Sequence, residues 1–139
     1  MSQAIPVPDF TETSAASVPG VVGGSHRTLL RVEGALMLLA GVASYRALGG
    51  SWGWFAACFL LPDVTLAGYA FGSRAGAVIY NAGHALIGPA LLAGMALALS
   101  LDVLLLASAV WLGHIGFDRM LGYGLKATTS FRDTHLGRI

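Results

Sequence analysis

Residues 102–124 read DVLLLASAVWLGHIGFDRMLGYG, an apolar stretch long enough to cross a lipid bilayer as a helix. About 20 helical residues at ~1.5 Å each span the hydrocarbon layer. Three more stretches of this kind precede it, at residues 29–48, 52–72 and 76–99. The connections between them are short, which is typical of neighbouring helices that run in opposite directions. The pattern therefore predicts an all-α fold, a membrane-embedded bundle of four antiparallel transmembrane helices.

The composition favours a membrane protein over a soluble one. The 139 residues are 55% hydrophobic and 11% charged, whereas roughly 25% of the residues in soluble domains are charged. A soluble four-helix bundle is the alternative, but it needs a polar face on every helix. Residues 34–45, 53–62 and 85–101 contain no charged side chain at all. The lipid bilayer is thus the expected partner, and a net charge of +1 argues against binding to nucleic acid.

The two ends of the chain differ from its apolar centre. Residues 1–27 are rich in Ser, Thr, Pro, Gly and Ala and lack the pattern of a secretory signal, so they are predicted to form a flexible tail. The transmembrane bundle is expected to occupy residues 28–125, and residues 126–139 form a basic C-terminal tail. Lys126, Arg132 and Arg138 of this tail are expected to lie among anionic lipid headgroups.

Basic residues set the expected orientation, because they concentrate on the cytoplasmic side of membrane proteins. If the N-terminus is cytoplasmic, seven of the eight basic residues lie on that side and only Arg46 lies on the other. The seven are Arg27, Arg31, Arg74, Arg119, Lys126, Arg132 and Arg138. The chain is therefore predicted to be integral to a membrane with both termini in the cytoplasm. The membrane is predicted to be a bacterial inner membrane.

Small residues and prolines mark where helices approach or bend. Small residues recur at four-residue spacing as Gly68 and Gly72, and as Ala90, Gly94 and Ala98. Such positions let helix backbones come close in lipid. They predict packing inside one chain first, with a homo-oligomer or a larger membrane complex as the alternative. Pro62 and Pro89 lie within the second and third stretches and are expected to kink their helices.

Seven polar side chains interrupt the apolar stretches, and most of them fall at similar depths. They are Glu33, Asp63, Asn81, His84, His114, Asp118 and Arg119. Counting from the expected cytoplasmic ends places the acidic residues and histidines of this set ~6 to ~13 Å deep, all in the cytoplasmic half. His114 and Asp118 also share one helix face, since they are four residues apart. A lone membrane carboxylate costs a few kcal/mol, so grouping these side chains would offset that cost.

The residue types in this group indicate metal chemistry. Neutral imidazole and carboxylate are the donors that zinc, iron and manganese accept. The predicted ligands of a divalent transition metal (Zn, Fe or Mn) are His84, His114, Asp118 and Asp63. Glu33 is predicted to act as a catalytic base or an additional ligand. Arg119 is predicted to hold a phosphate or carboxylate group of a substrate.

Five segments give the chain a family resemblance from about residue 28 to its end. They are LRVEGALMLLAG, FLLPDVTLAGYAFG, GAVIYNAGHALIGPALL, WLGHIGFDRMLGYGLK and FRDTHLGRI. With these segments the chain resembles a family of small integral membrane proteins, the domain-of-unknown-function family 4260. The resemblance implies a four-helix membrane protein and no particular activity.

Three functions are consistent with these observations. The first is a metal-dependent, hydrolase-like site for a lipid or other amphiphile. The second is a non-enzymatic membrane module, or a subunit of a larger assembly, in which the polar residues serve helix packing. The third is a pathway for protons or a small solute, although four short helices without an inverted repeat leave little room for alternating access.

Overall fold

The fold is known from a computed structural model that describes residues 24–128, 133–134 and 137–138. Its elements are α1 (Gly24–Ala47), α2 (Trp52–Phe59), the 3₁₀ helix η1 (Leu61–Phe71), α3 (Ser73–His84), α4 (Ile87–Leu99), α5 (Asp102–Leu121), β1 (Asp133–Thr134) and β2 (Gly137–Arg138). Most of the predicted N-terminal tail (1–23), and residues 129–132, 135–136 and 139 of the C-terminal tail, lie outside the described residues.

Within the described part of the chain, four helical stretches are long and apolar enough to cross a membrane. They are His26–Ala47, Trp52–Phe71, Ser73–Leu99 and Asp102–Leu121. This confirms the all-α class and the four apolar spans. Large apolar side chains such as Leu36, Phe71 and Leu97 are exposed on the outside. That surface suits lipid and not water.

Helix α1 begins at Gly24, before the predicted start at residue 29. Hydrophobicity marks only the part of a helix that lipid surrounds, whereas the hydrogen-bonded helix extends beyond that part. Polar residues at the start of α1 are therefore helical although they belong to no apolar stretch.

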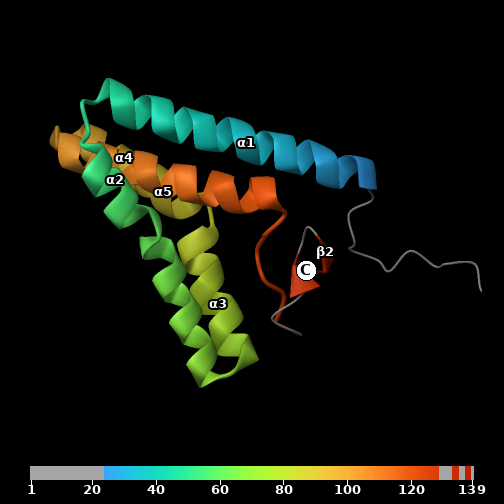
Figure 1. The fold of residues 1–139 in the computed structure, drawn as a ribbon. Coiled ribbons are helices and arrows are strands. Elements are labelled where there is room, and N and C mark those ends of the chain that lie inside the picture. The colour runs from blue at the N-terminus through green and yellow to red at the C-terminus, as the bar shows by residue number, and fades with distance from the viewer. Residues whose placement is uncertain (1–23, 129–132, 135–136, 139) are drawn as a thin grey trace, which may run out of the picture.

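Helices α1 and α5 form a closely packed pair (Figure 1). A Cβ atom added to Gly34 would lie 2.5 Å from the backbone nitrogen of Met120, and one added to Gly41 would lie 2.6 Å from the carbonyl oxygen of Ala109. The start of α1 therefore lies against the end of α5, and the two helices run in opposite directions. Gly116 of α5 in turn lies against the backbone of α1. Glycine allows this approach because any side chain would separate the backbones.

The second and third spans are both interrupted, whereas the sequence predicted kinks at Pro62 and Pro89 within continuous helices. The second span breaks at Leu60, between α2 and η1, and the third breaks at Ala85, whose ψ of 142° is extended. Each break precedes the proline: Pro62 opens η1, and Pro89 lies in the first turn of α4. Proline lacks a backbone N–H group, but N–H groups in the first turn of a helix make no hydrogen bond within the helix, so nothing is lost there. Each proline therefore starts a new helical segment and does not kink a continuous one.

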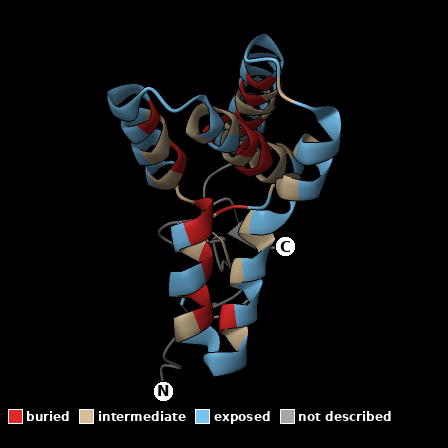
Figure 2. Cartoon of the chain, turned by 90° about the vertical axis from the view of Figure 1, so that its left-hand side faces the viewer, coloured by how far each residue is buried: buried red, intermediate tan, exposed pale blue. Residues whose placement is uncertain are grey.

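The breaks turn part of the molecule aside. Helices η1 and α3 lie side by side as a two-helix arm that extends away from α1 and α5, while α4 packs on α5 (Figures 1 and 2). Gly68 of η1 packs against Ile79 of α3, so this small residue serves packing within the chain. Gly72, at φ +102°, forms the turn between them. Gly94 has no atom within 4 Å of an added Cβ. A homo-oligomer through this open face of α4 stays a prediction.

The segment that follows α5, residues 122–128, returns towards the arm and is called here the C-terminal strap. The side chain of Asn81 accepts a hydrogen bond from the backbone nitrogen of Lys126 at 2.7 Å and donates one to its carbonyl oxygen at 2.9 Å. Lys126 also forms a backbone bridge with Thr134. The expectation that Lys126 lies among headgroups is wrong, since the residue is only 6% exposed. Its ammonium group lies 5.5 Å from the centre of the Tyr80 ring, a favourable cation–π position.

Candidate metal centre

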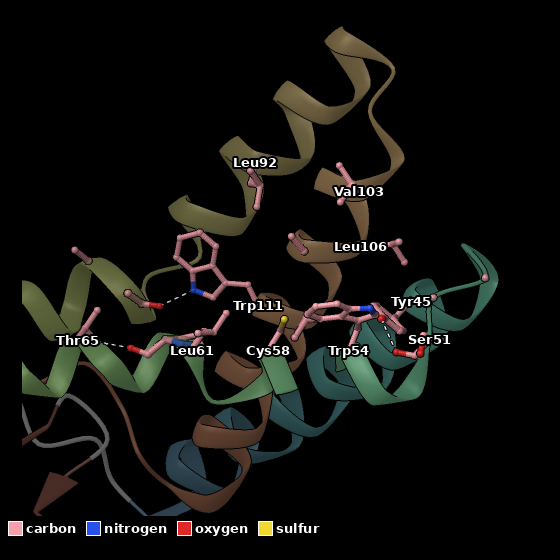
Figure 3. A pocket seen from close by; sticks show the side chains of 17 residues that line it. Tyr45, Ser51, Trp54, Cys58, Leu61, Thr65, Leu92, Val103, Leu106 and Trp111 are labelled. Atoms are coloured by element: carbon pink, nitrogen blue, oxygen red, sulfur yellow. Dashed lines mark hydrogen bonds between the residues drawn. The ribbon is translucent and has the colours of Figure 1, made fainter. Parts of the chain in front are cut away.

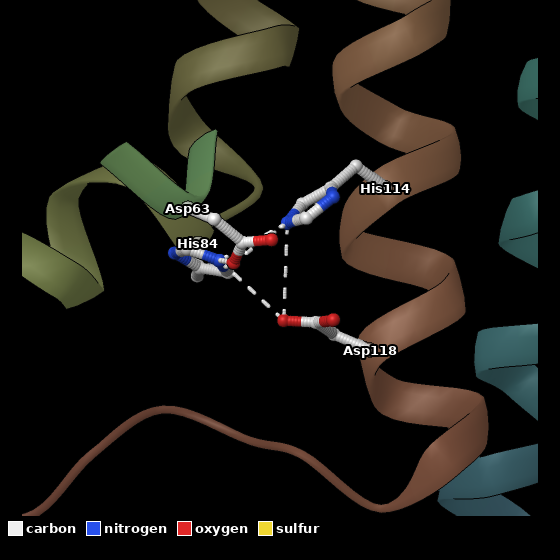
Figure 4. Close-up of side chains that lie close together, drawn as sticks. All are labelled: Asp63, His84, His114 and Asp118. Atoms are coloured by element: carbon white, nitrogen blue, oxygen red, sulfur yellow. Dashed lines mark hydrogen bonds and ion pairs between the residues drawn. The ribbon is translucent and has the colours of Figure 1, made fainter. Parts of the chain in front are cut away.

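Four side chains from three spans converge where the arm meets α5 (Figure 4). Asp63 comes from η1, His84 from α3, and His114 and Asp118 from α5. One nitrogen or oxygen atom of each lies within 4.8 Å of the corresponding atoms of the other three. These are the four residues predicted as metal ligands, and the structure brings all of them together.

The distances within this group have the size of a coordination shell. The two Nε2 atoms of His84 and His114 are 3.1 Å apart. His84 Nε2 is 3.5 Å from Asp63 Oδ1 and 3.4 Å from Asp118 Oδ2, and His114 Nε2 is 3.6 and 3.9 Å from the same two oxygens. Four ligands placed tetrahedrally at ~2.0–2.1 Å from zinc would be separated by about 3.3–3.4 Å. These five separations, from 3.1 to 3.9 Å, therefore scatter about the spacing that a single ion would impose.

The two helix breaks place Asp63 and His84 at helix ends of suitable polarity. Asp63 lies in the first turn of η1, and His84 is the last residue of α3. A helix N-terminus carries partial positive charge and favours a carboxylate, while a C-terminus carries partial negative charge and favours a bound cation. Interrupted helices in membranes are tolerated where they are buried in protein or line a site. The breaks thus aim one anion and one helix C-terminus at the same point.

Tyr80 holds two of the four side chains in place. Its backbone carbonyl oxygen lies 2.9 Å from His84 Nδ1 and can only accept, so Nδ1 carries the proton and Nε2 keeps a free lone pair. The Tyr80 ring stacks on the His84 ring at 3.8 Å between centroids. Its hydroxyl group donates a hydrogen bond to Asp118 Oδ2 at 3.1 Å. Partners of this kind fix the tautomer and orientation of metal ligands.

Burial divides the four side chains into three enclosed ones and one that is accessible. His114 and His84 are 1% and 3% exposed and the Asp118 side chain is 15% exposed, but the Asp63 side chain is 36% exposed. Phe59 packs edge-on against the His114 ring at 5.4 Å. Among the described residues, His114 Nδ1 is buried without a hydrogen-bond partner.

Charge adds an independent argument for a metal. If both carboxylates are ionised and both imidazoles neutral, the four groups carry a total charge of −2 within a few ångströms of one another. Such a charge inside a membrane span is costly. A divalent cation would make the whole group neutral and would use the lone pair that His84 presents. The residues present therefore fit a divalent transition metal.

A small cavity of about 10 Å³ adjoins the group and is lined by His84, Asp118 and Arg119 together with the strap residues Tyr123 and Gly124. This is roughly the room that one water molecule needs. Lys126 of the strap lies close by, and burial lowers the pKa of its ammonium group while the Asp118 carboxylate opposes that shift. The strap therefore encloses a water-sized space beside the ligands.

The other predicted site residues lie around this group. Arg119 lines the cavity, whereas Glu33 is exposed on α1 and lies near enough to Arg119 for their charges to interact. The ligand atoms that converge do not include Glu33. Asn81 pins the strap. The sequence alone indicated no role for Tyr80, although its four-residue spacing from His84 was an available signal, and it placed Lys126 among headgroups and not beside this group.

Comparison with known proteins places the chain in a family. Residues 27–139 match the family described as "Domain of unknown function (DUF4260)", and the chain belongs to that family. No curated protein and no solved structure matches it. The chemistry of the site therefore has to be argued from its own residues.

Proposed function

We propose that this protein is an integral membrane metalloenzyme that uses a divalent transition metal, zinc above all, to hydrolyse an ester bond in a lipid or other amphiphile. The observation that carries the proposal is the spacing of the four donor atoms of Asp63, His84, His114 and Asp118, which matches a single coordination shell. Neutral imidazole and carboxylate at tetrahedral spacing are a donor set that zinc accepts.

The unequal exposure of the ligands favours catalysis. Catalytic zinc sites keep three protein ligands and leave one position for water or substrate. Here His84, His114 and Asp118 are enclosed and would hold the metal, while the more accessible Asp63 would be the ligand to give way to substrate. A bound metal would polarise the scissile group and activate water. Water then adds to the ester, and an acid and an alcohol leave.

The chain's own residues take the remaining roles. Tyr80 orients Asp118 through its hydroxyl group and His84 through its carbonyl group. Arg119, at the cavity, is suited to bind the anionic part of a substrate. Glu33 neutralises Arg119 from α1 in this proposal, and so keeps an unpaired cation out of the span.

Metal content is the first test. The full chain is purified in detergent without chelator, and its metals are counted by mass spectrometry for the wild type, His114→Ala and His26→Ala. We expect about one transition metal per chain in the wild type and in His26→Ala, because His26 is exposed and outside the group. His114→Ala should retain less than a tenth of it. A wild type without bound metal overturns the proposal.

Hydrolysis is the second test. The probe is the 4-nitrophenyl ester of a 16-carbon fatty acid in mixed micelles. Turnover should disappear with a chelator, return with added zinc, and be absent from His114→Ala. A protein that holds its metal but shows no turnover contradicts the hydrolase.

That second result would favour another function, for which the site also offers an observation. Four protein ligands are the number found in closed, structural zinc sites. Because the ligands come from three spans, such a site would fasten the interrupted helices together. In that case metal removal lowers stability, and no substrate is turned over.

We further propose that both termini face the cytoplasm. Arg31 donates a hydrogen bond to the carbonyl oxygen of Met120 at 2.8 Å, so basic residues gather where α1 starts and α5 ends. Arg46 lies at the opposite end of α1. This asymmetry supports the orientation that the basic residues predict.

A further inference from the structure

A large apolar groove lies beside the candidate metal centre, between α2, η1, α4 and α5 (Figure 3). Its volume is about 850 Å³, and Trp54, Cys58, Leu61, Leu92 and Trp111 are among the residues that line it. This volume falls within the roughly 300–1,000 Å³ of sites that enclose small molecules. None of the lining residues is charged.

Three polar side chains in the groove are already hydrogen-bonded within the protein. The Trp111 indole N–H donates to the carbonyl oxygen of Gly83 at 2.6 Å. The hydroxyl groups of Tyr45 and Thr65 donate to backbone carbonyl oxygens, of Ser51 and Pro62, at 2.7 and 2.6 Å. These three groups need no hydrogen bond from a ligand, and the lining carries no charge, so the groove suits a hydrocarbon better than an ionic molecule.

The groove adjoins the metal centre along α5, although none of the four candidate ligands lines it. Val103, Ala107 and Val110 line the groove, and His114 and Asp118 follow at the same helical spacing. Residues three or four apart share one helix face. One face of α5 therefore passes from groove wall to metal ligands, and the groove portion extends for ~12 Å at the rise of an α-helix.

The two interrupted spans show the same proximity. Pro62 lines the groove and the next residue, Asp63, belongs to the metal centre; Gly83 lines the groove and the next residue, His84, belongs to the centre. All three elements that supply ligands thus also supply groove wall. An apolar ligand in the groove would therefore lie next to the residues that carry the candidate ligands.

We propose that this groove binds the acyl chain of the amphiphile and presents its ester group to the metal centre. An apolar space does not retain water, and the molecules that surround the spans in a bilayer are themselves acyl chains. An uncharged groove that adjoins charged ligands complements a molecule with a long apolar tail and a polar head. The proposal rests on the proposed hydrolase function and names its substrate class.

Binding is tested apart from turnover with a non-hydrolysable ether that carries a 16-carbon chain and with its two-carbon counterpart. Native mass spectrometry of the full chain should show one retained long-chain ligand and at least tenfold less of the short one. Leu92→Trp fills the groove and should lower retention at least tenfold. Leu91→Trp is the matched control, because Leu91 is 70% exposed and does not line the groove.

A second measurement needs no substitution, since Cys58 is the only cysteine of the chain and lines the groove. The long-chain ether should slow the reaction of Cys58 with a maleimide at least fivefold, and the short-chain ether should not. Equal protection by both ethers, or equal retention by Leu92→Trp and Leu91→Trp, overturns the proposal.

The metal-free variant separates the two proposals. His114→Ala should lose its metal. The long-chain ether should still slow the maleimide reaction of Cys58 in this variant, since His114 does not line the groove. A wild type that holds metal but does not retain the long-chain ether would refute the proposed role of the groove and leave the hydrolase proposal standing. Chain binding by a wild type that holds no metal would refute the hydrolase and leave an apolar binding site.

Discussion

The α1–α5 pair and the η1–α3 arm differ in whether their helices are continuous or interrupted. In the pair, continuous helices meet backbone to backbone at Gly34, Gly41 and Gly116. In the arm and its connections, the helices are interrupted, and the breaks lie next to the residues that face the metal centre. Continuous helices provide close packing in lipid, whereas interrupted ones provide backbone and side-chain groups for a site.

Helix α5 belongs to both regions, and its two faces show the difference. Gly116 lies against α1, while His114 and Asp118 face the arm. A metal held by these side chains would attach the arm to the pair, and the stability of the arm would then depend on it. Four predictions test this division.

The largest effect is expected from metal removal. A chelator should speed amide hydrogen exchange throughout η1 and α3 and leave most of α1 protected, because the ligands tie the arm to α5. Metal present at ~1,000 times its dissociation constant stabilises by about 4 kcal/mol. His114→Ala, which lacks the site, should show no response to chelator. Equal loosening of α1 and α3 would contradict the division.

The next effect concerns the close pair alone. Gly116→Ala should lower the unfolding free energy by ~1–3 kcal/mol, since the new Cβ would collide with the backbone of α1. Gly113→Ala is the control on the same helix, because the nearest atoms to its Cβ are 3.9 Å away. Thermal unfolding in detergent measures both. A similar loss in the two variants would show that close approach is not what glycine provides here.

A smaller effect is expected where a residue supports a ligand without being one. Tyr80→Phe keeps the ring stacked on His84 but removes the hydrogen bond to Asp118. Metal affinity, measured by competition with a chromogenic chelator, should fall ~10–100-fold. Tyr123 lines the same cavity, and the control variant Tyr123→Phe should bind metal like the wild type. Unchanged affinity in Tyr80→Phe would assign the hydroxyl group no part in the centre.

The smallest effect should be confined to the C-terminal strap. Asn81→Ala removes both hydrogen bonds to the backbone of Lys126, each worth about 1 kcal/mol. Amide exchange should rise in residues 122–128 and not in α1. Thr128→Ala, an exposed change in the same strap, should leave exchange as it is. Faster exchange in α1 as well would mean that the strap stabilises the pair.

The sequence was sufficient for the spans and for the grouping of ligands. Apolar length identifies a span because the bilayer imposes a minimum number of helical residues. Counting depth along each span brought Asp63, His84 and His114 to a common level, since every helix rises by the same amount per residue. The structure places these side chains side by side.

Counting depth does not show how each helix is rotated about its own axis, and so which side chains face the site. Depth alone put Glu33 with the others, but the next residue, Gly34, packs on α5, and Glu33 is left on the exposed side. The positions of the breaks could not be predicted either. A proline indicates that a helical segment starts nearby, but it does not show where the previous segment ends. Lys126 was placed at the surface because its partner, Asn81, is distant in the sequence.

The order in which the ligands appear along the chain has a consequence for biogenesis. Asp63 and His84 belong to the second and third spans, and His114 and Asp118 to the fourth. During synthesis, two polar groups thus enter the bilayer before the helix that completes their surroundings. A metal bound as proposed could therefore be captured only after the last span has been delivered, because His114 and Asp118 arrive with it.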